Sequence, residues 1–239
     1  VDITVASTAT AKVDTLSRSP VLFEGLSIGG MVELLRMPLT NIVLKVSACA
    51  WAAASDNEGQ AINYAFIYHQ ARAENARFAF ASSSLKGFGS SSALRIEPVN
   101  IPLPATDLRI VDVLLNDVDT GAFDVYIKHV HAVVIDNVKA RDLTLDTIVA
   151  SPGTTPAVDG GPSFAVDIKT SVLRETLEIV KSNFTAGGQA SLRIKGLRVM
   201  EAPSTEQSHN YGVVVHQTSM NDCFIELDDV VVGAGAQSL

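Results

Sequence analysis

The chain has few cysteines, few aromatic residues and no long apolar run. It contains 2 cysteines in 239 residues, and aromatic residues make up 6% of the chain although hydrophobic residues make up 47%. Two cysteines cannot supply a disulfide framework or a four-cysteine metal site. Cys49 and Cys223 each lie in an apolar stretch, where we expect buried free thiols. The core must therefore be built from Val, Ile, Leu and Ala.

Several functional classes are disfavoured by what is missing. No run of about 20 apolar residues occurs, and no basic segment leads into an apolar one, so we expect neither a membrane span nor an intact signal peptide. With 18 basic against 26 acidic residues the net charge is −8, and the basic residues are scattered, which opposes binding to nucleic acid or to an anionic membrane. No phosphate-binding loop, dinucleotide fingerprint or nucleophile elbow is present, so no cofactor is expected.

One motif occurs four times, at residues 64–69, 123–128, 164–169 and 211–216. Each copy starts with an aromatic residue, alternates apolar with other residues, and closes on His or Lys. A second alternating run follows each copy. Alternation with period two is typical of half-buried β-strands, and about thirteen such strands can be assigned from residue 42 onward. The sequence therefore predicts an all-β fold.

The second runs share a further pattern, in which an inward Ile is followed by polar residues and then by another alternating pair. It occurs at residues 135–140, 179–186, 194–199 and 225–232. A strand that bends through two polar residues into another strand is typical of the corner of a β-solenoid. With this pattern the chain resembles right-handed parallel β-helix proteins, the pectate-lyase-like solenoids that include phage tailspikes. The alternative is an antiparallel β-sandwich built from hairpins, which alternation alone does not exclude.

The first 40 residues differ from the rest of the chain. We expect an N-terminal arm or attachment region at residues 1–40, with a short helix over 27–38 that Pro38 ends, and a β-rich body at residues 41–239. Loops rich in Ser, Gly and Pro are predicted at 82–92, 151–162 and 202–210.

Four residues are candidates for catalysis if the chain is an enzyme: Asp228, Asp229, Arg193 and Lys195. They resemble fragments of the polygalacturonase-type hydrolase signature, in which paired Asp residues act as acid and base and a basic pair holds the uronate carboxylate. Here the basic pair precedes the acids and no Gly-His-Gly segment lies between them. Arg193 and Lys195 also fit the solvent face of a strand, which is the interpretation we favour.

Histidines give no clear metal site. His129 and His131 would share one face of a strand, but no third ligand can be placed, so no metal is expected. His69 and His216 close equivalent copies of the repeated motif, which indicates a structural place at a strand end.

The resemblance, together with the lack of an assembled catalytic constellation, favours a non-enzymatic bacteriophage virion protein of the capsid decoration, tail fibre or tailspike type. Its expected partners are two further copies in a homotrimer, other virion proteins and a surface glycan, and its expected location is the virion. The alternatives are a polysaccharide lyase or hydrolase of the β-helix type and a carbohydrate-binding module.

Overall fold

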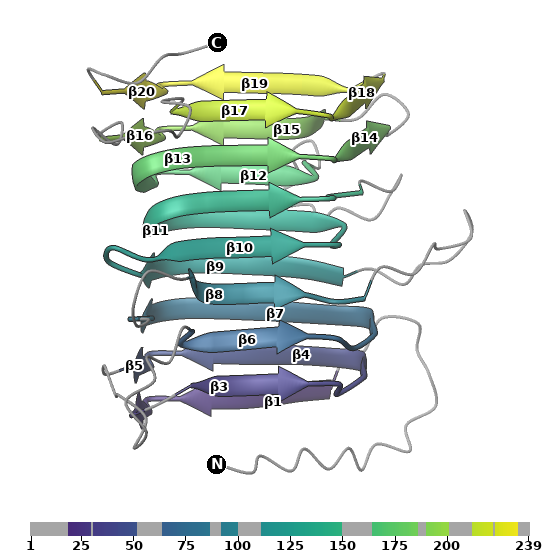
Figure 1. The fold of residues 1–239 in the computed structure, drawn as a ribbon, viewed down its shortest axis with the longest axis vertical. Coiled ribbons are helices and arrows are strands. Elements are labelled where there is room, and N and C mark those ends of the chain that lie inside the picture. Colours follow the sequence, from purple (N-terminus) through teal and green to yellow (C-terminus); the bar gives the residue numbers. More distant parts are fainter. Residues whose placement is uncertain are drawn as a thin grey trace.

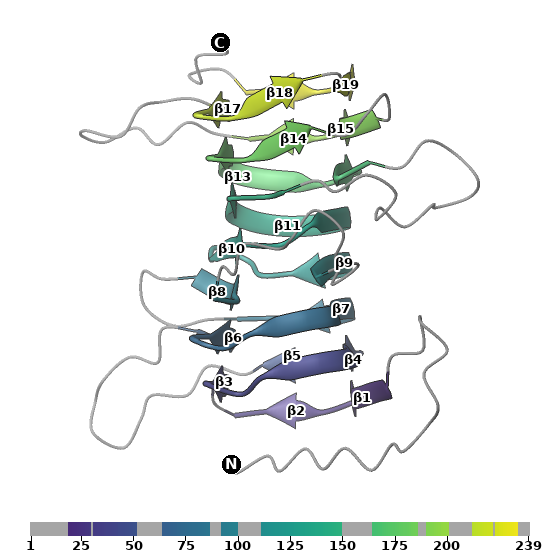
Figure 2. The same ribbon diagram turned by 90° about the vertical axis from the view of Figure 1, so that its right-hand side faces the viewer.

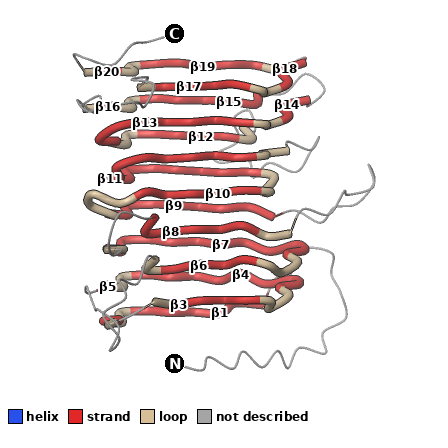
Figure 3. The backbone as a smooth tube through the Cα atoms, viewed as in Figure 1, coloured by secondary structure: helices blue, strands red, loops and turns tan. Residues whose placement is uncertain are grey.

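The computed structural model describes residues 19–29, 31–51, 64–86, 92–99, 111–149, 164–185, 190–200, 212–221 and 223–233. Within these residues the chain forms strands and turns and contains no helix (Figure 3). Figure 1 shows the strands stacked along one axis, with β1 and β19 at opposite ends. The all-β prediction is therefore confirmed for the described part of the chain.

Three rows of side-by-side strands make up the stack, and we name them A, B and C. Row A contains β1 (Ser19–Glu24), β4 (Leu39–Ser47), β7 (Ala73–Ser84), β9 (Val111–Asp119), the start of β11 (Ala132–Asp146), β12 (Val166–Lys169), β15 (Ala190–Lys195) and β19 (Phe224–Asp228). Row B contains β3 (Val32–Leu35), β6 (Phe66–His69), β8 (Ser92–Glu97), β10 (Asp124–Lys128), the end of β11, the end of β13 (Val172–Val180) and β17 (Val213–His216).

Row C is made of short pieces. It contains β2 (Ser27–Ile28), β5 (Ala50–Trp51), parts of β7, β9, β11 and β13, and then β16 (Arg198–Val199) and β20 (Val231–Val232). A separate pair, β14 (Asn183–Thr185) and β18 (Ser219–Asn221), lies at the corner between rows B and A (Figure 2).

All pairings between the described strands are parallel. The antiparallel β-sandwich is therefore wrong for these strands. A hairpin reverses the chain direction between neighbouring strands, whereas here the chain visits rows A, C and B in turn and then returns to row A one level further along the stack.

The length of one circuit explains the irregular spacing of the repeated motif. Asp112 pairs with Ala132, 20 positions later, and Val125 pairs with Leu143, 18 positions later. Other circuits are longer: Val133 pairs with Val166, 33 positions later. The longer circuits contain segments outside the described residues, such as 150–163, so insertions change the spacing while the strands keep their register.

Three motif copies occupy equivalent places, and one does not. Copies 64–69, 123–128 and 211–216 supply row B strands, whereas residues 166–169 form β12 in row A. The expectation of four equivalent copies is corrected on this point. The alternation of the two rows is the same, because each row has one face inward and one face outward, so the pattern itself does not distinguish them.

The expected helix over 27–38 is also wrong. Val32 and Leu34 are buried while Glu33 and Leu35 are exposed, a period of two that makes β3, and Pro38 precedes β4 instead of ending a helix. Strands β1, β2 and β3 pair with β4, β5 and β6 of the expected body. Residues 1–18 of the expected arm lie outside the described residues.

Of the three predicted loops, only 82–92 overlaps the described residues. Residues 82–84 belong to β7 and Ser92 begins β8, so the predicted loop 82–92 is wrong at both ends. Here the hydroxyl of Ser83 takes part in the backbone hydrogen bonding described below. The predicted loops 151–162 and 202–210 lie outside the described residues.

Residues with positive φ turn the chain from row A into row C in every described circuit. They are Gly25, Ala48, Ser82, Asp117, Asn137, Thr170, Gly196 and Asp229. Amides at several of these corners donate to the next circuit, as Thr170 N does to Lys195 O at 2.9 Å. The four bends expected after an inward Ile each contain a residue with positive φ. Asn137, Gly196 and Asp229 turn row A into row C, whereas Lys181 follows the end of β13 in row B, so the fourth bend is a different corner.

Thr170 is expected to be a weak point at one of these corners. A β-branched residue is strained in the left-handed region, whereas Asn tolerates it and already occupies the equivalent corner at position 137. We expect Thr170→Asn to raise the free energy of unfolding by about 1 kcal/mol, measured by chemical denaturation. The reciprocal change Asn137→Thr should lower it, and equal stabilities of the wild type and both variants would contradict this account.

The core lies between the rows and is apolar over its full length. Inward positions of row A form one register column through Leu44, Phe78, Val113, Val133, Val166 and Leu192, all buried. Four of the chain's few aromatic rings meet in two pairs, Phe66 with Phe80 at 5.1 Å and Tyr68 with Phe78 at 4.9 Å between centroids. Cys49 and Cys223 are free thiols, as expected, although Cys223 is only half-buried.

Buried serine hydroxyls form hydrogen bonds between successive circuits at some corners. Ser171 Oγ donates to Lys169 O at 2.7 Å and accepts from Val138 N of the preceding circuit at 3.1 Å. Ser83 Oγ bonds Ala81 O and Cys49 N in the same way, and Ser182 Oγ bonds Val180 O and Ile148 N. A hydroxyl directly after a corner residue therefore satisfies a buried amide that the strand pairing leaves over.

Removing such a hydroxyl should lower stability, because a buried backbone amide then has no hydrogen-bond acceptor. We expect Ser171→Ala to lower the free energy of unfolding by about 1–3 kcal/mol, since Val138 N loses its partner inside the core. Ser219→Ala is the control, because Ser219 is exposed and its backbone amide keeps its bond to Ser182 O. The comparison is made by urea denaturation, and an effect of Ser171→Ala no larger than that of the control would refute the role of the hydroxyl.

Candidate functional site

The outer face of row B carries a group of charged and aromatic side chains from successive strands. Alternation in β8, β10 and β11 points Arg95, Tyr126, Lys128 and Asp146 outward while their neighbours pack inside. Arg95 donates to Glu97 Oε2 through Nε at 2.9 Å and lies 4.9 Å from the centroid of the Tyr126 ring. Strands from three successive circuits therefore form one cluster, which we call the arginine–tyrosine cluster.

Lys128 continues the arginine–tyrosine cluster along the stack. Its Nζ lies 3.6 Å from Glu97 Oε1 and 3.4 Å from Asp146 Oδ2, and Tyr126 Oη donates to the same Oδ2 at 2.9 Å. Burial alone would raise the pKa of Asp146, but hydrogen bonds from Thr147 and Tyr126 and the charge of Lys128 lower it below its usual value. Burial and Asp146 raise the pKa of Tyr126. Asp146 is therefore ionised and Tyr126 keeps its proton at neutral pH.

A second group, the Asp124–Asp142 cluster, lies beside the first on the same outer face. Arg141 forms a two-pronged salt bridge to Asp124, with Nε and Nη2 each 2.7 Å from a carboxylate oxygen. Asp142 faces Asp124 across the β10–β11 pairing, one step from Val125 and Leu143. Its Oδ2 lies 3.5 Å from Arg141 Nε, and its Oδ1 is buried with no hydrogen-bond partner among the described residues.

The environment of Asp142 favours the protonated form. Burial raises its pKa to about 6, and the nearby carboxylates of Asp124 and Glu175 add to the effect. Asp124 instead is held by the guanidinium of Arg141. The two carboxyl groups on neighbouring strands therefore have different surroundings: Asp142 has a buried oxygen without a partner among the described residues, whereas Asp124 is bound by both prongs of Arg141.

The two basic residues predicted from the sequence have different ion-pair partners in the structure. Arg193 and Lys195 both project from the outer face of β15, as expected for a solvent-facing pattern. Arg193 is bound by Asp167 of the preceding circuit, Nε to Oδ1 at 2.7 Å and Nη2 to Oδ2 in a second short contact, and it stacks 4.1 Å from the Phe164 ring. Lys169 Nζ adds a third contact to Asp167 at 3.2 Å.

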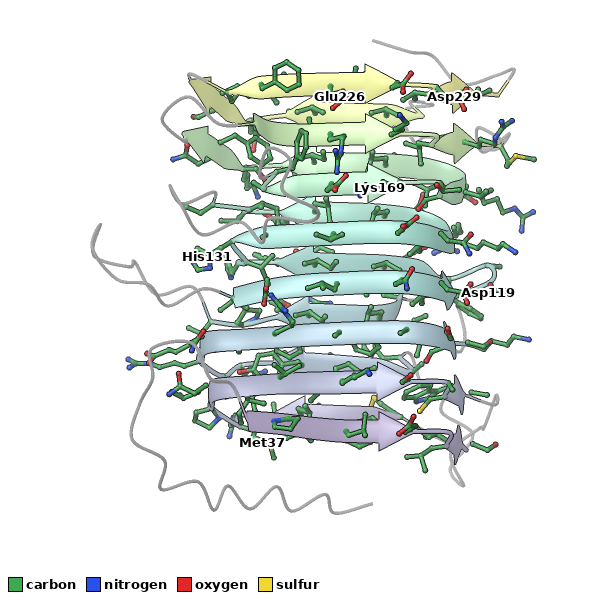
Figure 4. All side chains as sticks on the ribbon, turned by 180° about the vertical axis from the view of Figure 1, so that it is seen from behind. Met37, Asp119, His131, Lys169, Glu226 and Asp229 are labelled. Atoms are coloured by element: carbon green, nitrogen blue, oxygen red, sulfur yellow. The ribbon has the colours of Figure 1, made fainter. Side chains whose placement is uncertain are left out.

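Asp228 and Asp229 are not brought together as an acid–base pair. Lys195 Nζ lies 3.0 Å from Asp228 Oδ2, and both side chains are more than half exposed. Asp229 has a φ of 50° and turns the chain into row C. Figure 4 shows Glu226 on β19, Lys169 on β12 and Asp229 at the end of the row. Of the four candidate residues, Lys195 and Asp228 therefore form an exposed ion pair, Arg193 binds the buried Asp167, and Asp229 turns a corner.

Histidines occupy structural positions. His69 Nε2 lies 2.7 Å from Glu33 Oε1 and His216 Nε2 lies 2.9 Å from Glu178 Oε1, each at the end of a row B strand as predicted. His129 turns a corner and bonds Pro98 O at 3.0 Å, whereas His131 Nδ1 accepts from Val111 N. No group of three metal-ligating side chains occurs within the described ranges.

Neither cluster on row B was predicted from the sequence. Asp124 and Asp142 are 18 residues apart, and so are Tyr126 and Thr144, because one circuit separates them. Period-two alternation shows which residues face outward but not which strands are neighbours. If the length of this circuit, 18 residues, were known, the sequence would predict that Asp124 and Asp142 are neighbours.

The described part of the chain has no helix long and apolar enough to span a membrane. No protein-family model, no curated protein and no solved structure matches this chain.

Proposed function

We propose that the chain is a right-handed parallel β-helix and that it serves as a non-enzymatic structural protein of a bacteriophage virion. It is of the capsid decoration, tail fibre or tailspike type, assembles as a homotrimer and contacts other virion proteins. The parallel pairing of all described strands and the turn of each circuit through a residue with positive φ support the solenoid.

The observation that carries the structural role is the pairing of outward charges from one circuit to the next. Such contacts join Asp112 to Arg77, Asp167 to Arg193, Asp228 to Lys195, and Glu33 and Glu178 to His69 and His216. Side chains engaged in contacts along the stack axis are less available to a substrate. This arrangement favours a mechanical role over catalysis.

The assembly and the location are tested together. Light scattering coupled to size exclusion should give a mass three times that of one chain, and antibodies to the purified protein should label intact phage particles. A monodisperse monomer at micromolar concentration, combined with unlabelled particles, rejects the proposal.

A second candidate function is hydrolysis or lyase cleavage of an acidic polysaccharide, and one observation favours it. The pKa of Asp142 is raised to about 6, and Asp142 lies beside Asp124, which Arg141 binds, on a neighbouring strand. Glycosidic cleavage uses two carboxyl groups about 5–10 Å apart, one as acid and the other as base or nucleophile. Asp124 and Asp142 lie on paired strands one step from Val125 and Leu143, whereas Asp229 turns a corner directly after Asp228. A carbohydrate-binding module would use the same outer face without turnover.

A panel of acidic polysaccharides separates these functions. An enzyme releases reducing ends or unsaturated uronates, and Asp142→Asn should abolish that release whereas Asp228→Ala should not. Binding without release, measured by affinity electrophoresis, identifies a binding module. Loss of activity in Asp228→Ala with full activity in Asp142→Asn would instead restore the site predicted from the sequence.

A further inference from the structure

Exposed apolar side chains gather at the two ends of the stack. Among the described residues, thirteen large apolar side chains are exposed, and ten of them lie in the first circuit or from β17 onward. The four in the first circuit are Leu22, Leu26, Met31 and Leu35, and the six from β17 onward are Val215, Met220, Phe224, Ile225, Leu227 and Val231. Large exposed apolar patches on a soluble protein mark interaction sites. The ends of the stack are therefore the places where a partner is expected.

Both ends also present strand edges. We call β1, β2 and β3 the head and β17, β19 and β20 the tail. Each head strand pairs on one side only, with β4, β5 or β6, and each tail strand pairs on one side only, with β13, β15 or β16, as far as the described residues go. Such edges are templates for addition of a further strand from another chain.

The head and the tail have matching registers. Through successive pairings, Ile225 of the tail occupies the same column as Val21 of the head, and Leu227 the same column as Phe23. All four side chains lie on the inward side of row A. At the tail, Ile225 is 45% and Leu227 is 63% exposed, although the same columns are buried in the middle of the stack.

We propose that the tail binds the head of a second copy of this chain, so that β19 and β20 of one molecule pair in parallel with β1 and β2 of the next. Row B takes no part in this pairing, because β17 precedes β19 and lies one level behind it. The occupant is a second copy because its head supplies strands of rows A and C in the same direction and apolar residues in the same columns of row A. The contact is heterologous, so it extends from dimer to longer stacks. It goes beyond the proposed function, in which three chains associate in a closed trimer.

Charge limits this contact. In the continued register Asp228 of the tail lies beside Glu24 of the head, and the whole chain carries a charge of −8. Like charges on neighbouring strands oppose association and are screened by salt. The average stack length should therefore increase with ionic strength and with the variant Asp228→Asn.

Two blocked variants test the direction of the contact. Leu227→Glu places a charge in the tail column and blocks the tail, and Leu26→Glu places a charge at an exposed position of the head and blocks the head. Each variant alone should lose association by about tenfold or more, because an apolar contact is replaced by a buried charge. An equimolar mixture should form a dimer that does not grow, since one free head meets one free tail. Val149→Glu, an exposed position in the middle of the stack, is the control.

Sedimentation velocity over a wide range of concentrations gives the result, with circular dichroism and thermal unfolding to show that each variant folds. A wild-type mass that rises with concentration, together with a dimer only in the mixture, supports the proposal. A wild-type mass that does not change with concentration overturns it, as does a dimer formed by Leu26→Glu alone, which would mean tail-to-tail contact. A fixed trimer unaffected by Leu227→Glu would support the proposed function while rejecting this inference.

Discussion

Replacing Arg193 by methionine should lower the free energy of unfolding by about 3 kcal/mol. The reason is the carboxylate of Asp167, whose side chain is only 3% exposed on the outer face of row A. Removing one partner of a buried ion pair leaves a charge without compensation, which costs about 3–5 kcal/mol. Lys169, with its Nζ 3.2 Å from Asp167, supplies part of the lost charge, so we expect the lower end of this range.

Two further variants distinguish the buried charge from a simple loss of contacts. Lys195→Met removes the next basic residue of the same strand, whose ion pair with Asp228 is exposed, and should change stability little. Asp167→Leu combined with Arg193→Met removes both charges and should recover most of the lost stability. Guanidinium denaturation provides the measurement. Equal losses for Arg193→Met and Lys195→Met would show that burial of Asp167 does not govern the effect.

The strands could be predicted from the sequence because each buries alternate residues against a common core. Phe78 and Phe80 are buried while Arg77 and Ala79 between and beside them are not, and this pattern located β7. The corners could be predicted in part, since Asn137 and Gly196 are residue types that tolerate positive φ. Ala48 and Thr170 are not such types, and they turn the same corner because strand pairing on both sides fixes the backbone there.

The arrangement of the strands could not be predicted, because it depends on register between residues far apart in the sequence. Rows A and B have the same alternation, so residues 166–169 looked equivalent to residues 123–128 although they lie in different rows. The same uncertainty hid the Asp124–Asp142 cluster. The adjacent residues Asp228 and Asp229 were visible in the sequence as a pair. In the structure Asp228 forms an exposed ion pair with Lys195, whereas Asp229 turns the chain at a corner.

Asp142 makes the stability of the stack dependent on pH. Its pKa is raised from 3.8 to about 6, first by burial and then by Asp124 and Glu175, while Arg141 and the backbone amide of Thr176 act in the opposite direction. A group whose pKa is raised on folding holds its proton more tightly in the native state. Below about pH 3.8 it is protonated in both states and costs nothing, and stability is lost as the pH rises through about 6.

The variant Asp142→Asn should therefore be more stable than the wild type at neutral pH. A raised pKa of this size corresponds to about 3 kcal/mol at full ionisation, and an amide of the same shape avoids most of it, so we expect a gain of about 2 kcal/mol at pH 7.5. At pH 3.5 the gain should vanish. Urea denaturation across this pH range gives the difference directly.

The control for this variant is Glu24→Gln, an exposed carboxyl on β1 distant from the cluster. It should shift stability little at either pH, because a solvated carboxylate is not penalised on folding. A gain for Asp142→Asn that is the same at pH 3.5 and pH 7.5 would mean that packing, and not the charge, accounts for it. A loss at pH 7.5 would show that the ionised carboxylate is needed to hold Arg141, and the assignment of Asp142 as the proton-bearing partner of Asp124 would then be wrong.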